Sequence, residues 1–382
     1  MRKCLNLMLV ILLFMLSLLL AGCQFKDVDR RAFVLGLAVD SVEKKEGQGE
    51  GGGGGSKKHL VQVSLKLAIP EGDPTKRSQE AIIVSQISNS IPEAVRLLKS
   101  KVDKELDFSH CKTLLFGEGY AKTDIREMSD WIARRRDIQL IGHVAVARPT
   151  AKEVLGVRMI SERVPAYALI LSLGKEGTES PFIVSIYSYN FRRHLSEIGA
   201  DPILPLVEKE EEDVLVINKA MLFDKQRVRA ELTANEARLY NLLKTQGLRT
   251  SFNVELDDNI YTYNMETTRA KFKLLKSEEG KMIVQYKVGG RAVLEDNSKS
   301  VTTTGPILEQ VSKAASKQWE KEIKQFLVKI HGTGLDPLGW GLRYRAISWN
   351  NETEEEEWRK LYPNLEFSVK ADVRIQYSGM IR

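Results

Sequence analysis

Hydrophobic and polar side chains alternate along several stretches of the chain, and the period of this alternation predicts the elements. Residues 365–377 alternate apolar and polar positions without a break, which is typical of a strand with one buried face. Residues 60–68 show the same period of two, and the apolar run at 33–39 has the length of a buried strand. We expect these two strands to pair across the glycine-rich stretch 47–56. That stretch has the composition of a flexible hairpin tip and lacks the Lys-Ser/Thr of a phosphate loop.

Capping boxes mark helix starts, because a Ser or Thr and a Glu three residues later bond the free N–H groups of the first turn. Three such boxes lie at 90–93, 150–153 and 233–236. The longest helix is predicted from Pro306 to Ile330, where apolar residues recur at helical spacing.

The order of the elements differs between the two halves of the chain. Strand and helix candidates alternate between residues 33 and 155, whereas hairpins and the long helix dominate after residue 214. This order predicts an α+β or mixed α/β fold, with two or three domains of mixed sheets and packed helices. The proline-bearing stretch 201–207 fits a connection between domains, and the acidic run 208–213 that follows fits a solvated loop. We therefore expect an N-terminal mixed α/β domain or domains at 32–207 and a C-terminal α+β domain at 214–382.

The first 22 residues have the pattern of an export signal rather than of a folded element. Arg2 and Lys3 precede an uncharged, mostly apolar run at 5–20, as in a secretory signal peptide. The tetrapeptide Leu20-Ala21-Gly22-Cys23 that follows resembles the lipobox of bacterial lipoproteins. In such signals the Cys thiol receives a diacylglycerol, cleavage makes that Cys the new N-terminus, and its amine can receive a further acyl chain.

The N-terminal pattern predicts a signal peptide at 1–22 and a lipidated tether at 23–31, with Cys23 as the lipidation site. We expect no cofactor besides this covalent lipid. Two acyl chains on Cys23 would hold the protein on a lipid membrane. An uncleaved transmembrane anchor is the alternative, because the apolar run approaches the ~20 residues that span a bilayer.

Composition excludes several classes of protein. Of the 382 residues, 43% are hydrophobic, which excludes a disordered chain. Three cysteines exclude a disulfide-dense scaffold and a four-thiolate zinc site. The formal net charge of +6 falls by two, to +4, if the two basic residues of the signal are removed. Cys4 would be lost and Cys23 acylated, which leaves Cys111 as a free thiol that we expect to be buried in a strand.

The sequence contains none of the spacing motifs of the common hydrolases, metalloenzymes and nucleotide-cofactor enzymes. The five histidines are far apart, and His143 is expected to be a satisfied structural histidine inside a strand. We therefore expect a protein that is not an enzyme and has no metal site, and the secretory signal disfavours nucleic acid as a partner. The basic cluster 134–136 has two interpretations, as a complement to a helix dipole or as an attraction to anionic lipid headgroups.

Several short segments follow one another over nearly the whole length after Cys23. They are Phe33–Asp40, Phe108–Glu118, Gly142–Arg148 with Ala151–Leu155, Asp201-Pro-Ile-Leu-Pro205, Asp336-Pro-Leu-Gly-Trp-Gly341 and Trp358–Ile381. Their order and spacing resemble the Ger(x)C family, the lipoprotein C subunits of nutrient germinant receptors in endospore-forming bacteria. One departure is Gln24, because Trp often follows the lipidated Cys in that family.

The resemblance implies a lipoprotein on the outer face of the spore's inner membrane. It implies two protein partners, a multi-span A subunit and a transporter-like B subunit, and a role in nutrient-triggered germination through protein contacts. It carries over no catalytic residue, and the sequence identifies neither a germinant nor a ligand-binding residue. Two alternatives stay open. One is a lipid-anchored solute-binding protein with a cleft between its domains. The other, less favoured by the motifs, is a lipid-anchored cell-wall hydrolase with convergent carboxylates or a His-Asp pair.

Overall fold

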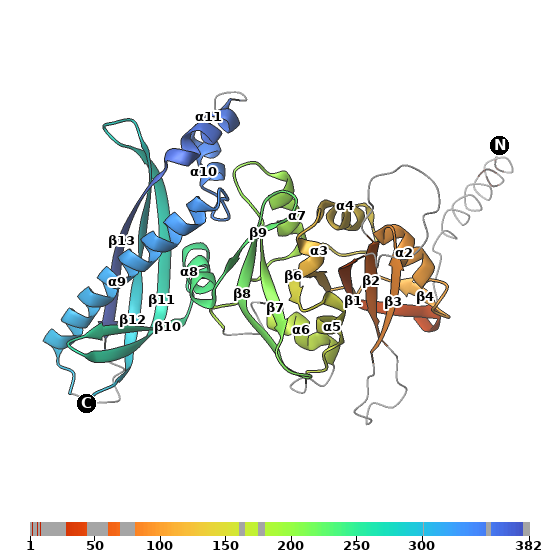
Figure 1. The fold of residues 1–382 in the computed structure, drawn as a ribbon, viewed down its shortest axis with the longest axis horizontal. Coiled ribbons are helices and arrows are strands. Elements are labelled where there is room, and N and C mark those ends of the chain that lie inside the picture. Colours follow the sequence, from red (N-terminus) through yellow and green to blue (C-terminus); the bar gives the residue numbers. More distant parts are fainter. Residues whose placement is uncertain are drawn as a thin grey trace.

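The computed structural model of the protein describes residues 28–43, 60–68, 81–159, 165–174, 180–300, 302–348 and 353–376, besides three isolated positions before residue 10. The lipobox residues Leu20, Ala21 and Gly22, the lipidation site Cys23 and the stretch 47–56 lie outside these ranges, so the expectations about them stay predictions. The described elements form two sheets that follow one another along an elongated molecule (Figure 1).

The first sheet has nine strands with a parallel centre and antiparallel flanks. The strands are β1 (Arg31–Val42), β2 (Leu60–Leu67), β3 (Ile82–Ser88), β4 (Glu105–Asp107), β5 (Thr113–Gly117), β6 (His143–Arg148), β7 (Ile203–Lys209), β8 (Leu215–Phe223) and β9 (Val228–Leu232). They lie in the order β3-β2-β1-β5-β6-β7-β8-β9, and the short β4 pairs with β1. The central strands β1, β5, β6 and β7 run parallel, whereas β2, β3, β8 and β9 pair antiparallel.

Helices cover both faces of this sheet. They are α2 (Ile91–Leu98), α3 (Glu118–Ala121), α4 (Arg126–Arg134), α5 (Ala151–Gly156), α6 (Pro165–Leu173) and α7 (Ser188–Ser196). The short η1 (Val28–Arg30) precedes β1 and is exposed. One face packs against α2, α4 and α7 through a core that includes Leu98, Trp131 and Phe191. The other face packs against α5 and α6 through Leu155 and Leu173. Strands buried on both faces need apolar side chains on both, which explains why the central strands are apolar without alternation.

The second sheet has four strands in the order β10-β11-β12-β13. The elements of this half are α8 (Ala234–Lys244), β10 (Thr250–Leu256), β11 (Asn259–Lys276), β12 (Met282–Asn297), α9 (Gly305–Gly332), α10 (Trp340–Ile347), α11 (Glu354–Leu361), η2 (Tyr362–Asn364) and β13 (Glu366–Gln376). β10, β11 and β12 are antiparallel neighbours, and β13 returns from the helices to run parallel to β12.

The long helix α9 covers one face of the second sheet and also the edge of β13. Trp319 of α9 is buried against the sheet. The backbone N–H groups of Val373 and Ile375 donate to Ser316 Oγ (2.9 Å) and Ser312 Oγ (3.0 Å) on the helix. These bonds occupy N–H groups that an open edge strand would offer to another chain. We therefore do not expect β13 to accept a partner strand.

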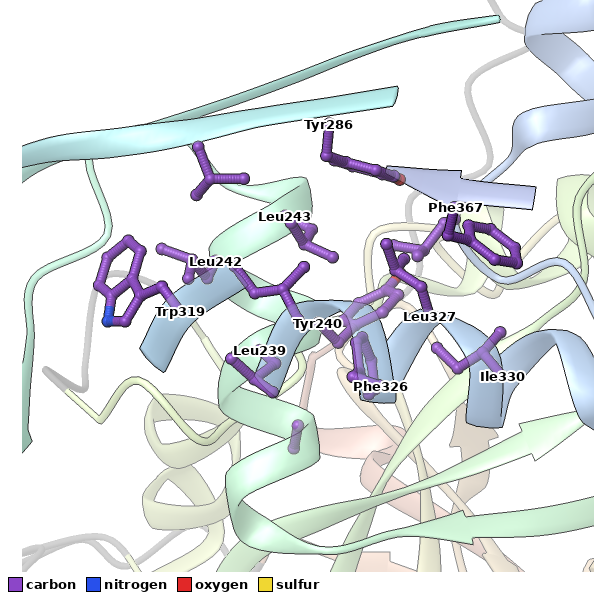
Figure 2. Close-up of a cluster of buried hydrophobic side chains, with 14 of the residues drawn as sticks. Leu239, Tyr240, Leu242, Leu243, Tyr286, Trp319, Phe326, Leu327, Ile330 and Phe367 are labelled. Carbon is purple, nitrogen blue, oxygen red and sulfur yellow. The ribbon is translucent and has the colours of Figure 1, made fainter. Parts of the chain in front are cut away.

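Helix α8 lies between the two sheets and joins their cores. Its residues Tyr240 and Leu242 belong to one hydrophobic cluster with Leu222 of β8 and Tyr286 of β12. Figure 2 shows the α8 side chains beside Phe326 of α9. The two sheets therefore share a continuous apolar core.

The first sheet continues past the boundary that the sequence suggests between the domains. β8 and β9 follow residue 214, yet they pair with β7 and complete this sheet. Arg31, which the sequence assigns to the tether, begins β1 and forms an ion pair with Asp107 (Nη1–Oδ2 2.8 Å). Local patterning predicts the β8–β9 hairpin but not the sheet it joins. The division into 32–207 and 214–382 stays a prediction, while the sheets themselves separate after β9.

Several local predictions are confirmed. The α+β and mixed α/β elements are present, and β1 pairs antiparallel with β2. Ser90, Thr150 and Thr233 each accept a hydrogen bond from the backbone N–H three residues later, at the starts of α2, α5 and α8. The predicted long helix corresponds to α9.

The sequence pattern leaves β10 and the first half of β11 unpredicted. The turn between these strands is formed by Asp257 and Asp258, which both have positive φ (53° and 57°). Such a turn usually contains glycine, and Asp-Asp does not give that signal. The inward residues, such as Tyr261 and Tyr263, alternate with polar ones over only a short stretch on each side.

Leu242 tests how much the shared core stabilises the protein. Leu242→Ala is expected to lower the free energy of unfolding by about 2–5 kcal/mol, because it leaves a cavity at a fully buried position between the sheets. Leu97→Ala makes the same change at a position that is 42% exposed, and is expected to change that free energy by less than about 0.5 kcal/mol. Guanidinium chloride unfolding, followed by tryptophan fluorescence, measures both variants. Equal effects would contradict a core shared through α8.

Candidate functional site at the junction of the two sheets

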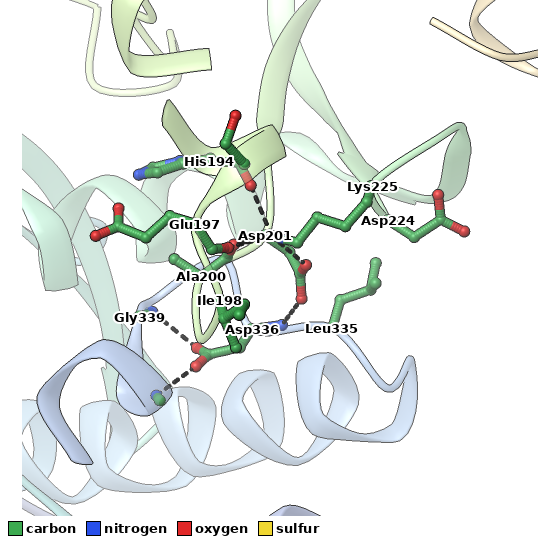
Figure 3. Close-up of polar contacts among 12 residues, drawn as sticks. His194, Glu197, Ile198, Ala200, Asp201, Asp224, Lys225, Leu335, Asp336 and Gly339 are labelled. Carbon is green, nitrogen blue, oxygen red and sulfur yellow. Dashed lines mark hydrogen bonds and ion pairs between the residues drawn. The ribbon is translucent and has the colours of Figure 1, made fainter. Parts of the chain in front are cut away.

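Two segments of the family resemblance meet where the two sheets join. Asp201 lies between α7 and β7, and Asp336 lies in the loop between α9 and α10. The backbone N–H of Asp201 donates to the carbonyl oxygen of Asp336 (2.8 Å), and the N–H of Asp336 donates to Asp201 Oδ2 (2.8 Å). This reciprocal pair holds together two loops that are 135 residues apart in the sequence (Figure 3).

The carboxylate of Asp336 is buried at the start of α10 and accepts three backbone hydrogen bonds. Oδ1 accepts from the N–H groups of Gly339 (2.7 Å) and Trp340 (3.0 Å), and Oδ2 accepts from that of Gly341 (2.7 Å). The start of a helix leaves such N–H groups without partners inside the helix. Burial raises the pKa of Asp336 to about 7, although the three N–H donors oppose this shift.

Lys225, in the turn between β8 and β9, closes the other side of the junction. Its Nζ donates to the carbonyl oxygens of His194 (2.6 Å), Glu197 (2.8 Å) and Ala200, and forms an ion pair with Asp201 Oδ1 (3.1 Å). Carbonyl groups at the C-terminal end of a helix have no partner in the helix, and a cation there complements the helix dipole. One ammonium group thus holds α7, the β8–β9 turn and Asp201 together (Figure 3).

Two glycines let the backbones at the junction approach each other closely. Gly199 has a φ of +88°, and a Cβ there would lie 2.6 Å from the carbonyl carbon of Gly341. A Cβ on Gly341 would lie 2.5 Å from Nε1 of Trp358. Beside them, Nε1 of the buried Trp340 donates to Tyr286 Oη (2.9 Å), which ties α10 to β12. The junction is therefore closely packed as well as hydrogen-bonded.

Carboxylates also converge at the ends of the parallel strands of the first sheet. Arg148 forms ion pairs there with Glu118 (2.7 Å), Glu208 (2.8 Å) and Glu231 (2.8 Å), and Lys219 also contacts Glu208 (3.0 Å). The hydrogen bond from Arg148 lowers the pKa of Glu118 to about 2. A carboxylate held in its ionised form by a guanidinium is a poor proton donor near neutral pH. This cluster fits a structural ion network better than an acid–base pair.

The cysteine and histidine candidates of the sequence lie away from the junction. Cys111 is fully buried, as predicted, but it lies two residues before β5 (Thr113–Gly117) rather than inside a strand. Burial raises the pKa of its thiol to about 12. The thiolate that would react is therefore scarce. His143 is buried in β6, where burial lowers its pKa and its ring centroid lies 4.6 Å from that of Tyr187. Its Nδ1 has no hydrogen-bond partner among the described residues, so packing rather than a satisfied hydrogen bond holds it.

The basic cluster 134–136 separates into two kinds of residue. The Arg135 guanidinium lies 4.5 Å from the centroid of the Phe108 ring and forms an ion pair with Asp137. Arg134, in the last turn of α4, and Arg136 are exposed. Both interpretations of these two exposed arginines, dipole complement and lipid attraction, stay open.

The part of the chain that the structure describes contains no group of His, Cys, Asp or Glu side chains that could hold a metal ion. None of its helices combines the length and the apolar character needed to cross a bilayer.

In the sequence, Asp201 and Asp336 stand out only as parts of longer segments that resemble the family, and Lys225 and Tyr286 carry no signal of a role at the junction. An Asp shortly before Gly-Trp-Gly is compatible with a helix start, and this signal could have pointed to Asp336. Nothing local to the Asp224-Lys-Gln turn indicates which carbonyl groups its lysine reaches.

The protonation of Asp336 should make the free energy of unfolding depend on pH. A carboxyl group whose pKa is raised by folding binds its proton more tightly in the folded chain. Its contribution to stability is therefore lost as the pH rises from its ordinary pKa of 3.8 to about 7. Asp336→Asn does not titrate, so the wild type should lose roughly 2–4 kcal/mol relative to this variant over that interval. Denaturant unfolding at several pH values measures this difference.

Asp258→Asn is the matched control for this experiment. Asp258 is exposed, and its variant should keep the pH profile of the wild type. Identical profiles for the wild type and Asp336→Asn would contradict a raised pKa at the junction.

Two family models and several known proteins match this chain. Residues 24–209 match the model described as spore germination protein N-terminal domain, and residues 218–379 match the one described as spore germination B3/GerAC like, C-terminal. The chain is 21% identical to spore germination protein GerQC of Bacillus cereus, over 97% of this chain and 98% of that protein. It is 23% identical to spore germination protein KC of Bacillus subtilis (strain 168), over 76% of this chain and 77% of that protein.

A solved structure, that of the GerBC protein, has a similar fold. It superimposes with a TM-score of 0.56 at 13% identity and covers 84% of this chain and 94% of that one. At this identity the likeness shows the fold alone. The two family models, in contrast, match nearly all of the sequence after Cys23. In this chain the regions that match the two models contact each other through Asp201 and Asp336. The chain therefore belongs to the Ger(x)C family of spore germination proteins.

Proposed function

We propose that the protein is the lipid-anchored C subunit of a nutrient germinant receptor and that it acts through protein contacts rather than by catalysis. The observation that carries this proposal is the match of both family models, in order, directly after a lipobox. Relatives that match along three quarters or more of this chain are named as spore germination proteins.

A contact role agrees with how the polar groups are used. The convergent carboxylates at Glu118, Glu208 and Glu231 are ion-paired with Arg148. Among the described residues, no hydrogen bond or ion pair joins a histidine to a carboxylate. The polar groups at the junction bond backbone atoms and fix the two sheets in one relative position, as a subunit with partners on several surfaces requires.

The tether would keep the first sheet close to the membrane. Only seven residues separate Cys23 from Arg31, the first residue of β1. A chain of this length spans at most about 30 Å when fully extended. With the lipid on Cys23 in the outer face of the spore's inner membrane, the first sheet would lie beside the extracytoplasmic surfaces of the A and B membrane subunits.

Substitution of the lipidated cysteine tests the anchor directly. Cys23→Ala is expected to abolish incorporation of radiolabelled palmitate and to slow nutrient-triggered germination, because two acyl chains supply most of the membrane affinity. Cys4→Ala is the matched control, since the same change lies within the predicted signal peptide and should leave lipid labelling and germination unchanged. Wild-type germination of spores whose protein carries no lipid would contradict the proposed role of the tether.

A lipid-anchored solute-binding protein is the second candidate, because the structure has a cleft between the two halves. Its volume is about 650 Å³, and its lining includes Phe182 and Ser185 on one side and Asn241 and Arg249 on the other. A thermal-shift screen of the full chain in detergent against amino acids, sugars and nucleosides separates the two candidates. We expect no saturable shift from this chain alone, whereas a solute-binding protein would be stabilised by its ligand.

A further inference from the structure

The face of the second sheet that lies opposite α9 carries a set of positive charges. Successive side chains in a strand point to opposite faces, so the strand register shows which residues share this one. The exposed cations on it are Arg269, Lys271 and Lys273 of β11, Lys287 and Arg291 of β12, and Lys370 and Arg374 of β13. The opposite face carries the apolar residues that pack against α9.

The register places like charges directly opposite one another on three neighbouring strands. Lys271 of β11 faces Lys287 of β12, and Lys287 in turn faces Lys370 of β13. Arg291 and Arg374 are opposed in the same way. Like charges at directly opposite positions destabilise a sheet. The folded chain by itself therefore gains no stability from this arrangement.

Only one of these cations is paired within the described chain. Arg374 forms an ion pair with Asp372 (Nη2–Oδ2 2.8 Å) on the same strand. The side chains of the other six cations form no hydrogen bond or ion pair with any described carboxylate. Most of the positive charge on this face is thus left uncompensated.

The same face is hollowed. A groove of about 710 Å³ is lined by these side chains and by Asp372, the ion-pair partner of Arg374. We call it the basic groove and define it by the six unpaired cations Arg269, Lys271, Lys273, Lys287, Arg291 and Lys370. Gly289 lies between Lys287 and Arg291 and has no side chain to fill the floor. A Cβ there would lie 2.3 Å from the carbonyl oxygen of Asp372, so the close approach of β12 and β13 requires glycine.

We propose that the basic groove binds a carboxylate-rich segment of a partner protein. The inference rests on the proposed function, in that the partner would be another subunit of the receptor. Charge complementarity carries it, because six unpaired cations line one groove and their mutual repulsion would be relieved by carboxylates.

Two observations favour a protein segment over a lipid surface. A groove encloses a single polypeptide segment, whereas a flat bilayer touches only its rims. Figure 1 also places the second sheet at the opposite end of the molecule from β1, next to which the lipid tether would attach.

Fluorescein-labelled deca-glutamate is the probe for the groove. The full chain, purified in a non-ionic detergent, is titrated with this peptide at low ionic strength, and fluorescence anisotropy reports binding. We expect saturable binding that weakens as salt is added. The triple variant Lys271→Glu, Lys287→Glu, Lys370→Glu is expected to bind about tenfold or more weakly. The three opposed positions still carry charges of one sign in this variant, so we expect the fold to be kept.

The matched control changes the same number of charges on the other side of the sheet. Lys317→Glu, Lys321→Glu, Lys324→Glu lies on the exposed side of α9 and should bind deca-glutamate like the wild type. Equal loss of binding in both triple variants would overturn the proposal, because it would reflect net charge alone. Absence of deca-glutamate binding to the wild type would also overturn it.

A second titration, with lipids, distinguishes an anionic membrane surface from an acidic protein segment as the ligand of the groove. Dihexanoylphosphatidylglycerol and dihexanoylphosphatidylcholine are tested with the same variants. Groove-dependent binding of the anionic lipid, without binding of deca-glutamate, would overturn the proposal in favour of a membrane surface. None of these measurements needs another receptor subunit or the lipid on Cys23, so their failure is distinguishable from failure of the proposed function.

Lys287→Glu gives a second readout that needs no ligand. It turns the two like-charge pairs that Lys287 forms with Lys271 and Lys370 into two opposite-charge pairs. We expect it to raise Tm by about 2–4 °C while it weakens deca-glutamate binding. An unchanged or lower Tm would contradict the view that this row of lysines destabilises the free protein.

Discussion

The hydrogen-bonded pairing of Asp336 with Asp201 is the interaction on which the relative position of the two sheets depends. The apolar core around α8 supplies most of the attraction between the halves, but hydrophobic burial has little directional preference. The hydrogen bonds between Asp336 and Asp201 give this contact a direction, and the carboxylate of Asp336 holds its own loop against the start of α10. Lys225 adds the β8–β9 turn to the same junction. A chain held in this way keeps the surfaces of its two halves in a fixed arrangement.

Local features of the fold could be predicted from the sequence because they depend on neighbouring residues. The capping residues Ser90, Thr150 and Thr233 each act within one helical turn, and the stripe of α9 needs only the helical period. The sheet that β8 and β9 join is a long-range property, since their alternation fits either half of the chain. The β10–β11 turn was not predicted because Asp257-Asp258 is an uncommon sequence for a turn of this kind.

The junction of the two sheets and the basic groove likewise depend on contacts between residues far apart in the sequence. Asp201 and Asp336 are visible in the sequence as parts of similar segments, but their pairing spans 135 residues and has no sequence signal. The alternation of Arg269, Lys271 and Lys273 is visible on one strand. The three-lysine row needs the registers of β12 and β13 as well, which depend on a bulge and on the return of the chain through α9 to α11.

We propose that this chain works as a membrane-held subunit through contacts with other proteins. Affinity purification of a tagged copy from detergent-solubilised spore membranes, with mass spectrometry of the proteins recovered, tests it most directly. We expect one multi-span subunit and one transporter-like subunit to be recovered with it in a fixed ratio. Recovery of the tagged chain without any multi-span membrane protein, from spores in which that copy supports normal germination, would contradict it.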